Sequence, residues 1–316
     1  MADEVPYKCD RLGRLGRGDG SGEVRGLTKA NPGGSGMSVV KVITDSSAGL
    51  PQELARKFNI SVVPISIQFG SETFRDGVDL DTRTFYAKLR GDVLPKTSQP
   101  SPGEFARVYK EALREFSSIV SVHVTAKASG TVQSARLASD MFPEADITVV
   151  DSGLTSMGLG FLALAGARVA KLGRKRSEVL RAIEEARERI AVYVALPSLE
   201  FLRKSGKVGA GQALLASLLS INPILTMKDG LLQVAERART FPRALGRILE
   251  LVEGRVGRRP VRLAVLHADA LTQAKEYCAR VVRALNCVEA HVVEIGPALA
   301  VHAGAGLLGM AVEVVE

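Results

Sequence analysis

Apolar strand-like runs and helix-like segments alternate along most of this chain, and this alternation constrains the fold more than any other feature. After residue 37 the buried-strand run VVKVITD leads into a polar turn and a helix over 51–58. Further strands follow at 119–124 and 147–150, and a long apolar helix covers about 155–172. Because short loops join these elements, we predict an α/β fold with a mostly parallel sheet and helices on both faces.

The second half of the chain alternates less regularly. Strands are predicted at 190–195, 262–267 and 291–295 with helices between them, and INPILTMKDGLLQVAERART resembles a hairpin with Asp229 and Gly230 at its tip. At 316 residues the chain suits two domains better than one. We therefore predict two lobes within 38–316: an N-terminal lobe at about 38–152 and a C-terminal α/β lobe at about 153–316 with some antiparallel pairing.

Residues 1–36 differ in composition from the rest. They are rich in Gly, Arg and Asp and have no apolar periodicity, which predicts a disordered N-terminal extension. They also contain no apolar segment of the kind found in secretory signals. The three cysteines, Cys9, Cys278 and Cys287, cannot all pair with one another, which favours a reducing compartment. We expect a cytoplasmic location.

Two uncharged stretches are long enough to be weighed as membrane spans. Residues 208–227 run twenty positions without a charge, and residues 295–312 run eighteen. The first stretch contains Asn222 and Pro223, and the second contains Pro297 and several glycines. Because their hydrophobicity is only moderate, we expect buried helix and strand here.

The net charge of +8 raises the question of nucleic acid. The excess is spread as single Lys and Arg residues, and only 172–181 and 254–262 are locally basic. With five Tyr, ten Phe and no Trp, no platform for stacking bases is evident. We expect a solvated basic surface and no nucleic-acid partner.

Sequence signatures of common cofactors and catalytic sites are missing or out of context. The one G-x-G-x-x-G spans 304–309, but the chain ends seven residues later, whereas a dinucleotide site needs a helix and strand after it. Gly206-Lys207 is followed by Val208 and is therefore no P-loop. No nucleophile elbow, zinc motif or EF-hand loop occurs. We expect no metal, no cofactor and no catalytic residues.

Two hydroxyl-rich segments remain. In KTSQPSPGEF, Ser101 is predicted to cap a helix and Glu104 to complete a capping box. This leaves Thr97 and Ser98 unexplained, next to a helix start whose N–H groups favour an anion. The second segment, 125–131, follows a strand and begins a helix. Taken alone, each segment is explained equally well by local capping.

Several segments, in their order along the chain, together resemble the DegV family. They are VKVITDSSAGLP, VPISIQFGSETFRDGVDL, KTSQPSPGEF, SGTVQSA, VVDSGLTSMGLG, SLEFLRKSGKVGAGQALLASLLSINPIL, AERARTFPRAL and VHAGAGLLG. The resemblance runs from Ser38 to the C-terminus, and KTSQPS together with SGT..SA is its most specific part. It implies a two-domain protein that binds one fatty acid in a tunnel between its domains. Some family members present that fatty acid to a kinase that phosphorylates the carboxyl group.

The resemblance also assigns residues to the fatty acid carboxylate. The threonine of KTSQPS falls on Thr97, with Ser98 beside it. A family serine falls on Ala126, which has no hydroxyl, so the second donor is either Thr125 or missing.

Three further positions are implied by the resemblance. An arginine of the family falls on Lys207, which offers a point charge where arginine clamps a carboxylate with two bonds. A histidine is retained at His302, and Arg239 matches an arginine implicated in the kinase encounter. A purely structural alternative remains open for each of the last two: His302 as an ordinary core histidine, and Arg239 as a solvated charge on the hairpin.

The implied function is a carrier that holds a palmitate-like fatty acid without reacting with it and touches membranes only transiently during ligand exchange. The alternative is an esterase or acyltransferase that uses Ser98 or Thr125 with His302 as base. The missing nucleophile elbow and the lack of an evident Asp orienter disfavour this enzyme. Candidates for tunnel lining, which are equally well explained as ordinary core, are Met157, Leu159, Phe161, Leu214, Leu215 and Leu218.

Overall fold

The computed structural model describes residues 7–9, 15–17, 39–91, 93–205 and 222–315. The elements before residue 152, in chain order, are β1 (Tyr7–Cys9), β2 (Leu15–Arg17), β3 (Val40–Asp45), the short 3₁₀ helix η1 (Ser46–Ala48), α1 (Gln52–Lys57), β4 (Ser61–Val63), β5 (Ser66–Phe69), β6 (Glu72–Arg75), α2 (Thr82–Leu89), β7 (Lys96–Ser98), α3 (Pro102–Ala112), β8 (Ser118–His123), α4 (Thr131–Ser139) and β9 (Asp146–Asp151). Those after it are α5 (Ser156–Lys171), α6 (Arg176–Arg189), β10 (Ile190–Ala195), α7 (Glu200–Lys204), β11 (Asn222–Lys228), β12 (Leu231–Ala238), α9 (Phe241–Val256), β13 (Val261–His267), α10 (Leu271–Ala284), β14 (Cys287–Glu294), α11 (Pro297–Ala303) and β15 (Leu308–Val314).

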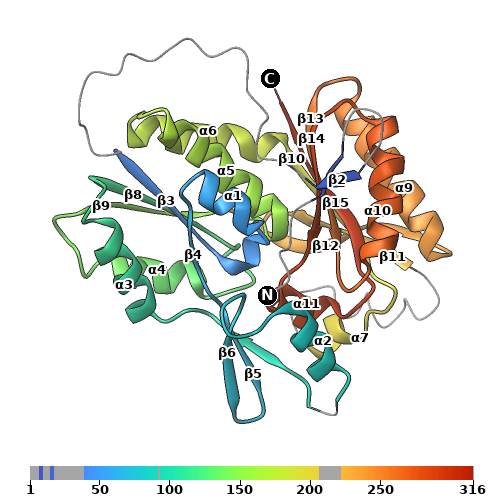
Figure 1. Cartoon of the computed structure of the whole chain (residues 1–316), viewed down its shortest axis with the longest axis horizontal. Coiled ribbons are helices and arrows are strands. Elements are labelled where there is room, and N and C mark those ends of the chain that lie inside the picture. The colour runs from blue at the N-terminus through green and yellow to red at the C-terminus, as the bar shows by residue number, and fades with distance from the viewer. Residues whose placement is uncertain (1–6, 10–14, 18–38, 92, 206–221, 316) are drawn as a thin grey trace.

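A four-stranded sheet forms the centre of the N-terminal lobe. Its order is β4-β3-β8-β9 and every pairing is parallel. Helices α3 and α4 cover one face and α5 and α6 the other (Figure 1). Alternate residues of β3 face the two layers, since Val40 and Val42 pack towards α5 while Ile43 packs with Phe105 of α3. The predicted mostly parallel sheet flanked by helices is confirmed.

A smaller antiparallel sheet, with the order β6-β5-β7, lies beside the four-stranded sheet. Its packing core is aromatic: Phe69 makes edge-on contacts with Phe74 and with Phe85 of α2. This sheet carries the KTSQPS segment. The capping box predicted after it is confirmed, with Ser101 and Glu104 bonded to each other's backbone amides and Pro102 in the first helical position.

The C-terminal lobe is built on an eight-stranded mixed sheet with the order β12-β11-β10-β15-β13-β14-β1-β2. Only the β13–β14 pairing is parallel among the pairings described, so the expected antiparallel content is confirmed. Helices α9 and α10 pack on one face, and the other faces α5 and α6 (Figure 1). The predicted hairpin is present, with positive φ at both Asp229 and Gly230.

Two short segments of the N-terminal extension are described as strands, and the disorder expected of residues 1–36 stays a prediction. Residues 7–9 form β1, which pairs with the edge strand β14, and residues 15–17 form β2, which pairs with β1. The exposed edge of β14 supplies unpaired backbone groups, and these accept a strand without needing apolar periodicity in it. The rest of the extension lies outside the described residues.

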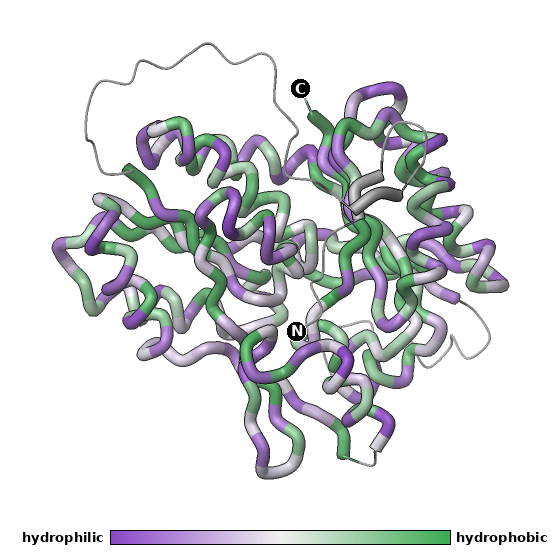
Figure 2. Tube along the Cα trace, viewed as in Figure 1, coloured by the Kyte–Doolittle hydropathy of each residue, from purple (hydrophilic) through white to green (hydrophobic). Residues whose placement is uncertain are grey.

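Helix α5 lies between the two larger sheets and touches both. It is apolar along most of its 16 residues, and one continuous cluster of buried side chains joins it to β3, β8, β10 and β15. Figure 2 shows the same pattern, with apolar residues along the strands and in the helix between them. Both lobes pack on α5, so the packing does not assign this helix to one of them. The boundary near residues 152–153 stays a prediction.

The uncharged stretches have the structure expected where they are described. Residues 297–303 form α11 and 308–312 belong to β15, while 222–227 belong to β11. The remainder of the first stretch, including Leu214, Leu215 and Leu218, lies outside the described residues. Among the helices that the structure describes, none is long and apolar enough to cross a membrane.

A buried ion network ties α5 to the eight-stranded sheet. Glu313 of β15 is 3% exposed and lies 2.9 Å from Arg262 of β13 and 3.5 Å from Arg168 of α5. Both arginines also approach Glu289 of β14, which accepts a hydrogen bond from His291. Burial by itself raises the pKa of Glu289, but the hydrogen bond from His291 and the neighbouring charges together outweigh it and lower the pKa to about 2.

We expect the substitution Glu313→Gln to lower the free energy of unfolding by about 3 kcal/mol, because it leaves two partly buried arginines, Arg168 and Arg262, facing one carboxylate. Urea denaturation measures this change. The control Glu250→Gln removes an exposed partner of Arg247 and should leave the unfolding midpoint where it is. Equal small effects of the two substitutions would contradict a structural role for the network.

Candidate functional site

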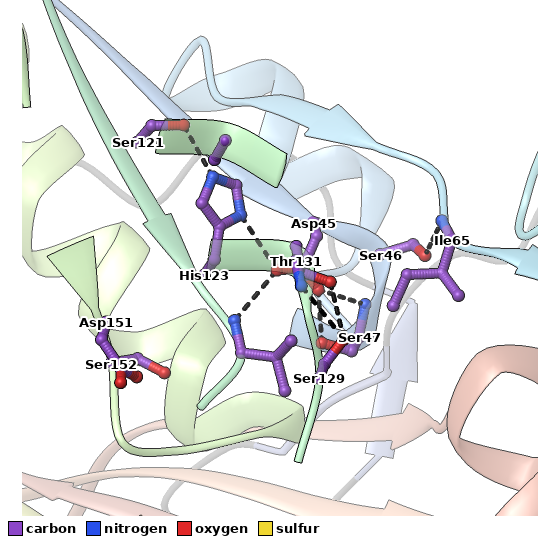
Figure 3. Close-up of polar contacts among 12 residues, drawn as sticks. Asp45, Ser46, Ser47, Ile65, Ser121, His123, Ser129, Thr131, Asp151 and Ser152 are labelled. Atoms are coloured by element: carbon purple, nitrogen blue, oxygen red, sulfur yellow. Dashed lines mark hydrogen bonds and ion pairs between the residues drawn. The ribbon is translucent and has the colours of Figure 1, made fainter. Parts of the chain in front are cut away.

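Polar side chains gather at the carboxyl ends of the four-stranded sheet. Asp45, the last residue of β3, is fully buried and accepts hydrogen bonds from the backbone N–H of Ser47 at 3.1 Å and of Val124 at 3.0 Å. It also accepts from the Ser47 hydroxyl and lies 3.0 Å from Nδ1 of His123 (Figure 3). All its partners are internal, so Asp45 fixes the geometry of this edge and is not a free ligand group.

The turn after β8 joins this edge to the turn after β9. The Ala126 N–H donates to Oδ1 of Asp151 at 3.2 Å, and the Ser152 N–H donates to the His123 carbonyl at 3.0 Å. The polar ends of β3, β8 and β9 therefore lie together.

Thr97 and His302 meet at one point of the structure. Thr97 lies on β7 opposite the fully buried Ile67 of β5, so its side chain shares the inner face of that sheet. His302 lies in the last turn of α11. Oγ1 of Thr97 is 3.2 Å from Nε2 of His302, in a partly buried position, although 205 residues separate them in the chain. This pair is the centre of the candidate site.

Ser98 does not share that position. Successive side chains of a strand point to opposite faces, and Ser98 is exposed where Thr97 is partly buried. The next residue, Gln99, lies against the second hydroxyl-rich segment. Its side-chain amide nitrogen is 3.0 Å from the position that a Cβ on Gly130 would occupy. The two segments singled out from the sequence are thus neighbours.

Thr125 is buried and its hydroxyl is already engaged. It donates at 2.8 Å to the carbonyl of Gly230, at the tip of the β11–β12 hairpin. Nζ of Lys127 donates to the Asp229 carbonyl at 2.7 Å. We call these two bonds the hairpin clasp. It joins the C-terminal lobe to the N-terminal lobe.

The remaining predicted positions are less informative. Ala126 is exposed and contributes only its backbone N–H. Arg239 is exposed between β12 and α9, where it is open to a partner. Lys207 lies outside the described residues. No group of three or more His, Cys, Asp or Glu residues able to hold a metal occurs in the described part of the chain.

Sequence reasoning missed Asp76. This residue follows β6, is 4% exposed, and hydrogen-bonds with the Ser46 side chain and with the backbone N–H of Ala298 in α11. Its burial is not evident from the sequence, because Asp76 stands between Arg75 and Gly77 and not in an apolar run. The available signal was an Asp-Gly pair that begins no helix and no hairpin.

Comparison with known proteins agrees with this arrangement. A family model described as an uncharacterised protein of the DegV family matches residues 39–314. The chain belongs to the DegV family. A DegV domain-containing protein of Streptomyces coelicolor is 34% identical over 275 residues, which cover 86% of this chain and 98% of the relative.

Two solved structures show the same fold. A DegV family protein of Thermus thermophilus, described by its fatty acid binding, superposes with a TM-score of 0.81 at 35% identity, over 88% of this chain and all of that one. DegV of Bacillus subtilis, described as a fatty acid binding protein, gives a TM-score of 0.81 at 29% identity, over 88% and 99% of the two chains. The two-lobed α/β architecture is therefore that of the DegV family.

The hairpin clasp of this DegV family member has a steric requirement at Gly230. Its φ is +74°, and a Cβ there would lie 2.8 Å from Oγ1 of Thr125. We expect Gly230→Ala to destabilise the protein by about 2 kcal/mol, through backbone strain and this clash. Gly173→Ala is the matched control, because Gly173 has φ +71° with nothing within 4 Å, and it should show the strain alone.

Thermal unfolding of both variants and of the double variant Thr125→Ala with Gly230→Ala separates the two effects. The double variant should recover part of the loss, since it removes the hydroxyl that the new methyl group meets. If Gly230→Ala costs no more than Gly173→Ala, the clasp is not closed in solution.

Proposed function

We propose that this protein is a carrier that holds one long-chain fatty acid, with the carboxylate at Thr97 and His302 and the tail in the apolar region between the lobes. The observation that carries the proposal is the 3.2 Å approach of Thr97 Oγ1 to His302 Nε2 at the junction of β7 and α11. A hydroxyl and an imidazole are both able to donate to a carboxylate without reacting with it. Ser98 is exposed and remains a neighbour of this pair by sequence only.

The second hydroxyl would come from Thr125. In the closed clasp the Thr125 proton goes to the Gly230 carbonyl, and a hydroxyl donates only one hydrogen bond. Thr125 would therefore serve the ligand once the hairpin tip lifts. Ala126 offers a backbone N–H at most, and Lys207 is proposed as the charge behind the head group.

The tail would supply most of the affinity. About fourteen methylenes at roughly 0.8 kcal/mol each give a gross ~11 kcal/mol, from which ordering and entry costs subtract. The fatty acid binding described for the Thermus and Bacillus proteins supports this assignment. Met157, Leu159 and Phe161 are buried on α5 and belong to the shared core that such a tail would contact.

We also propose that the carrier presents its ligand to a fatty acid kinase and performs no chemistry itself. The exposed Arg239, which follows β12 at the end of the hairpin opposite its tip, is the proposed contact with that kinase. Exchange of the ligand would need only transient contact with a membrane, in the cytoplasm.

Extraction of the purified protein followed by mass spectrometry should recover about one fatty acid per chain. Thr97→Val keeps the shape of the side chain and should weaken binding of oleate about tenfold, because it removes a hydrogen bond to a charged group. Thr73→Val is the control and should bind normally, because Thr73 is exposed on β6, the opposite edge strand of the same sheet. Absence of any fatty acid after extraction, with none taken up on addition, would defeat the proposal.

An esterase is the second candidate, because the Thr97–His302 distance also suits a nucleophile and its base. The pairs weighed from the sequence are less favourable, since Ser98 is exposed and Thr125 donates to Gly230. We expect p-nitrophenyl esters to be hydrolysed no faster by the protein than by its His302→Ala variant. Saturable turnover that disappears in His302→Ala would establish the enzyme instead.

A further inference from the structure

Helix α11 carries His302 and is held at its two ends by different parts of the molecule. At its C-terminal end Gly304 has φ +69°, and a Cβ there would lie 2.5 Å from the Phe201 ring of α7. The helix also contacts η1, β5 and β7 of the N-terminal lobe, and its N-cap residue Gly296 lies against Asp76. The position of the His302 ring therefore depends on contacts made at both ends.

The N-terminal end of α11 lacks a cap of its own. Its N-cap residue, Gly296, has no side chain to offer, and Pro297 in the first position has no N–H. The Ala298 N–H is then the first that needs an acceptor, and it hydrogen-bonds to Asp76. Contact is close, since a Cβ on Gly296 would lie 3.3 Å from each oxygen of the Asp76 carboxyl.

Asp76 connects α11 to two other segments. Its carboxyl hydrogen-bonds with the Ser46 side chain of η1. Ser46 Oγ accepts from the Ile65 N–H at 3.0 Å, and the Asp76 N–H donates to the Ile65 carbonyl at 2.9 Å. Asp76 thus joins the start of α11 and η1 through its carboxyl, and the start of β5 through its backbone N–H.

We propose that Asp76 is the positioning residue of the head-group site: by capping α11 it holds His302 against Thr97 and so sets the grip on the ligand carboxylate. This inference rests on the proposed function for the identity of the ligand. The contact between Asp76 and α11 and the approach of His302 to Thr97 do not depend on that function. Ala298 and His302 are four residues apart on one short helix, or about 6 Å along its axis at 1.5 Å per residue. A change at the cap therefore reaches the ring through a rigid element.

The electrostatic surroundings make the cap sensitive to pH. Burial raises the pKa of Asp76 to about 6, and the nearby Asp45 carboxylate adds to the increase, against the hydrogen bonds from Ser46 and Ala298. The adjacent Arg75 pairs with Asp79 at 2.8 Å. The pKa of Asp76 in the folded protein lies above its ordinary value of 3.8. The free energy of unfolding therefore falls as the pH rises from about 4 to 6, because the buried carboxyl loses its proton over this range. The ionised form is the stronger acceptor for the Ala298 N–H.

The test compares Asp76→Asn, Asp76→Ala and the wild type at pH 5 and pH 8, with oleate as the probe. Asn mimics the neutral carboxyl, so Asp76→Asn should match the wild type at pH 5 and bind about fivefold more weakly at pH 8, where a charged acceptor is lost. Asp76→Ala removes the cap and should bind at least about tenfold more weakly at both pH values.

Asp81→Ala is the matched control. Asp81 accepts from the Thr84 N–H at 2.7 Å and caps α2, so its loss also weakens a helix, but one that does not carry His302. This control should bind oleate within about twofold of the wild type. If Asp81→Ala and Asp76→Ala lose affinity equally, the effect is general destabilisation and the proposal is overturned.

Nuclear magnetic resonance of the protein without added oleate provides a readout that does not depend on the ligand. The Ala298 amide shift should titrate near pH 6 in the wild type and lose that step in Asp76→Asn, and the His302 ring signals should move in Asp76→Ala but not in Asp81→Ala. Unchanged signals overturn the positioning role. Should the wild type bind no oleate while these shifts appear, the proposed function fails and the positioning role stands.

Discussion

The close packing of α5 between the two larger sheets is the constraint on which the rest of the structure depends. A Cβ on Gly158 would lie 2.7 Å from Val192 of β10, and one on Gly166 would lie 2.9 Å from Ile183 of α6. These glycines let the helix approach both neighbours more closely than larger residues allow. Because the helix is buried against both sheets, the lobes share one core, and their relative placement is fixed by packing density.

This placement creates the candidate site. Thr97 comes from the small sheet beside the N-terminal lobe and His302 from a helix of the C-terminal half, and neither lobe alone contains both. The hairpin clasp and the cap at Asp76 cross the same junction. The groups assigned to the ligand are thus held by contacts between the lobes, while the Asp45 network fixes the strand ends within one lobe.

Features set by local sequence could be predicted, and features set by distant contacts could not. The parallel strands, the hairpin at Asp229-Gly230 and the capping box at Ser101 each follow from a few neighbouring residues. The hydrogen-bond partner of Thr125, Gly230, is 105 residues away in the chain, so no local sequence motif indicates this contact. Ser98 is adjacent to Thr97 in the sequence, yet adjacency on a strand places side chains on opposite faces.

The carboxylates of the ion network and the carboxyl of Asp76 differ in the charges that face them. Glu313 and Glu289 face arginines, so their ionisation is supported by neighbouring positive charge. Asp76 faces no cation within the described residues, and its Oδ2 has no hydrogen-bond partner there. A carboxyl in that position lowers stability when ionised, and an amide would cap Ala298 without that cost. The ionised acceptor is nonetheless what most strongly orders the start of α11, and α11 is the element that brings an imidazole to Thr97.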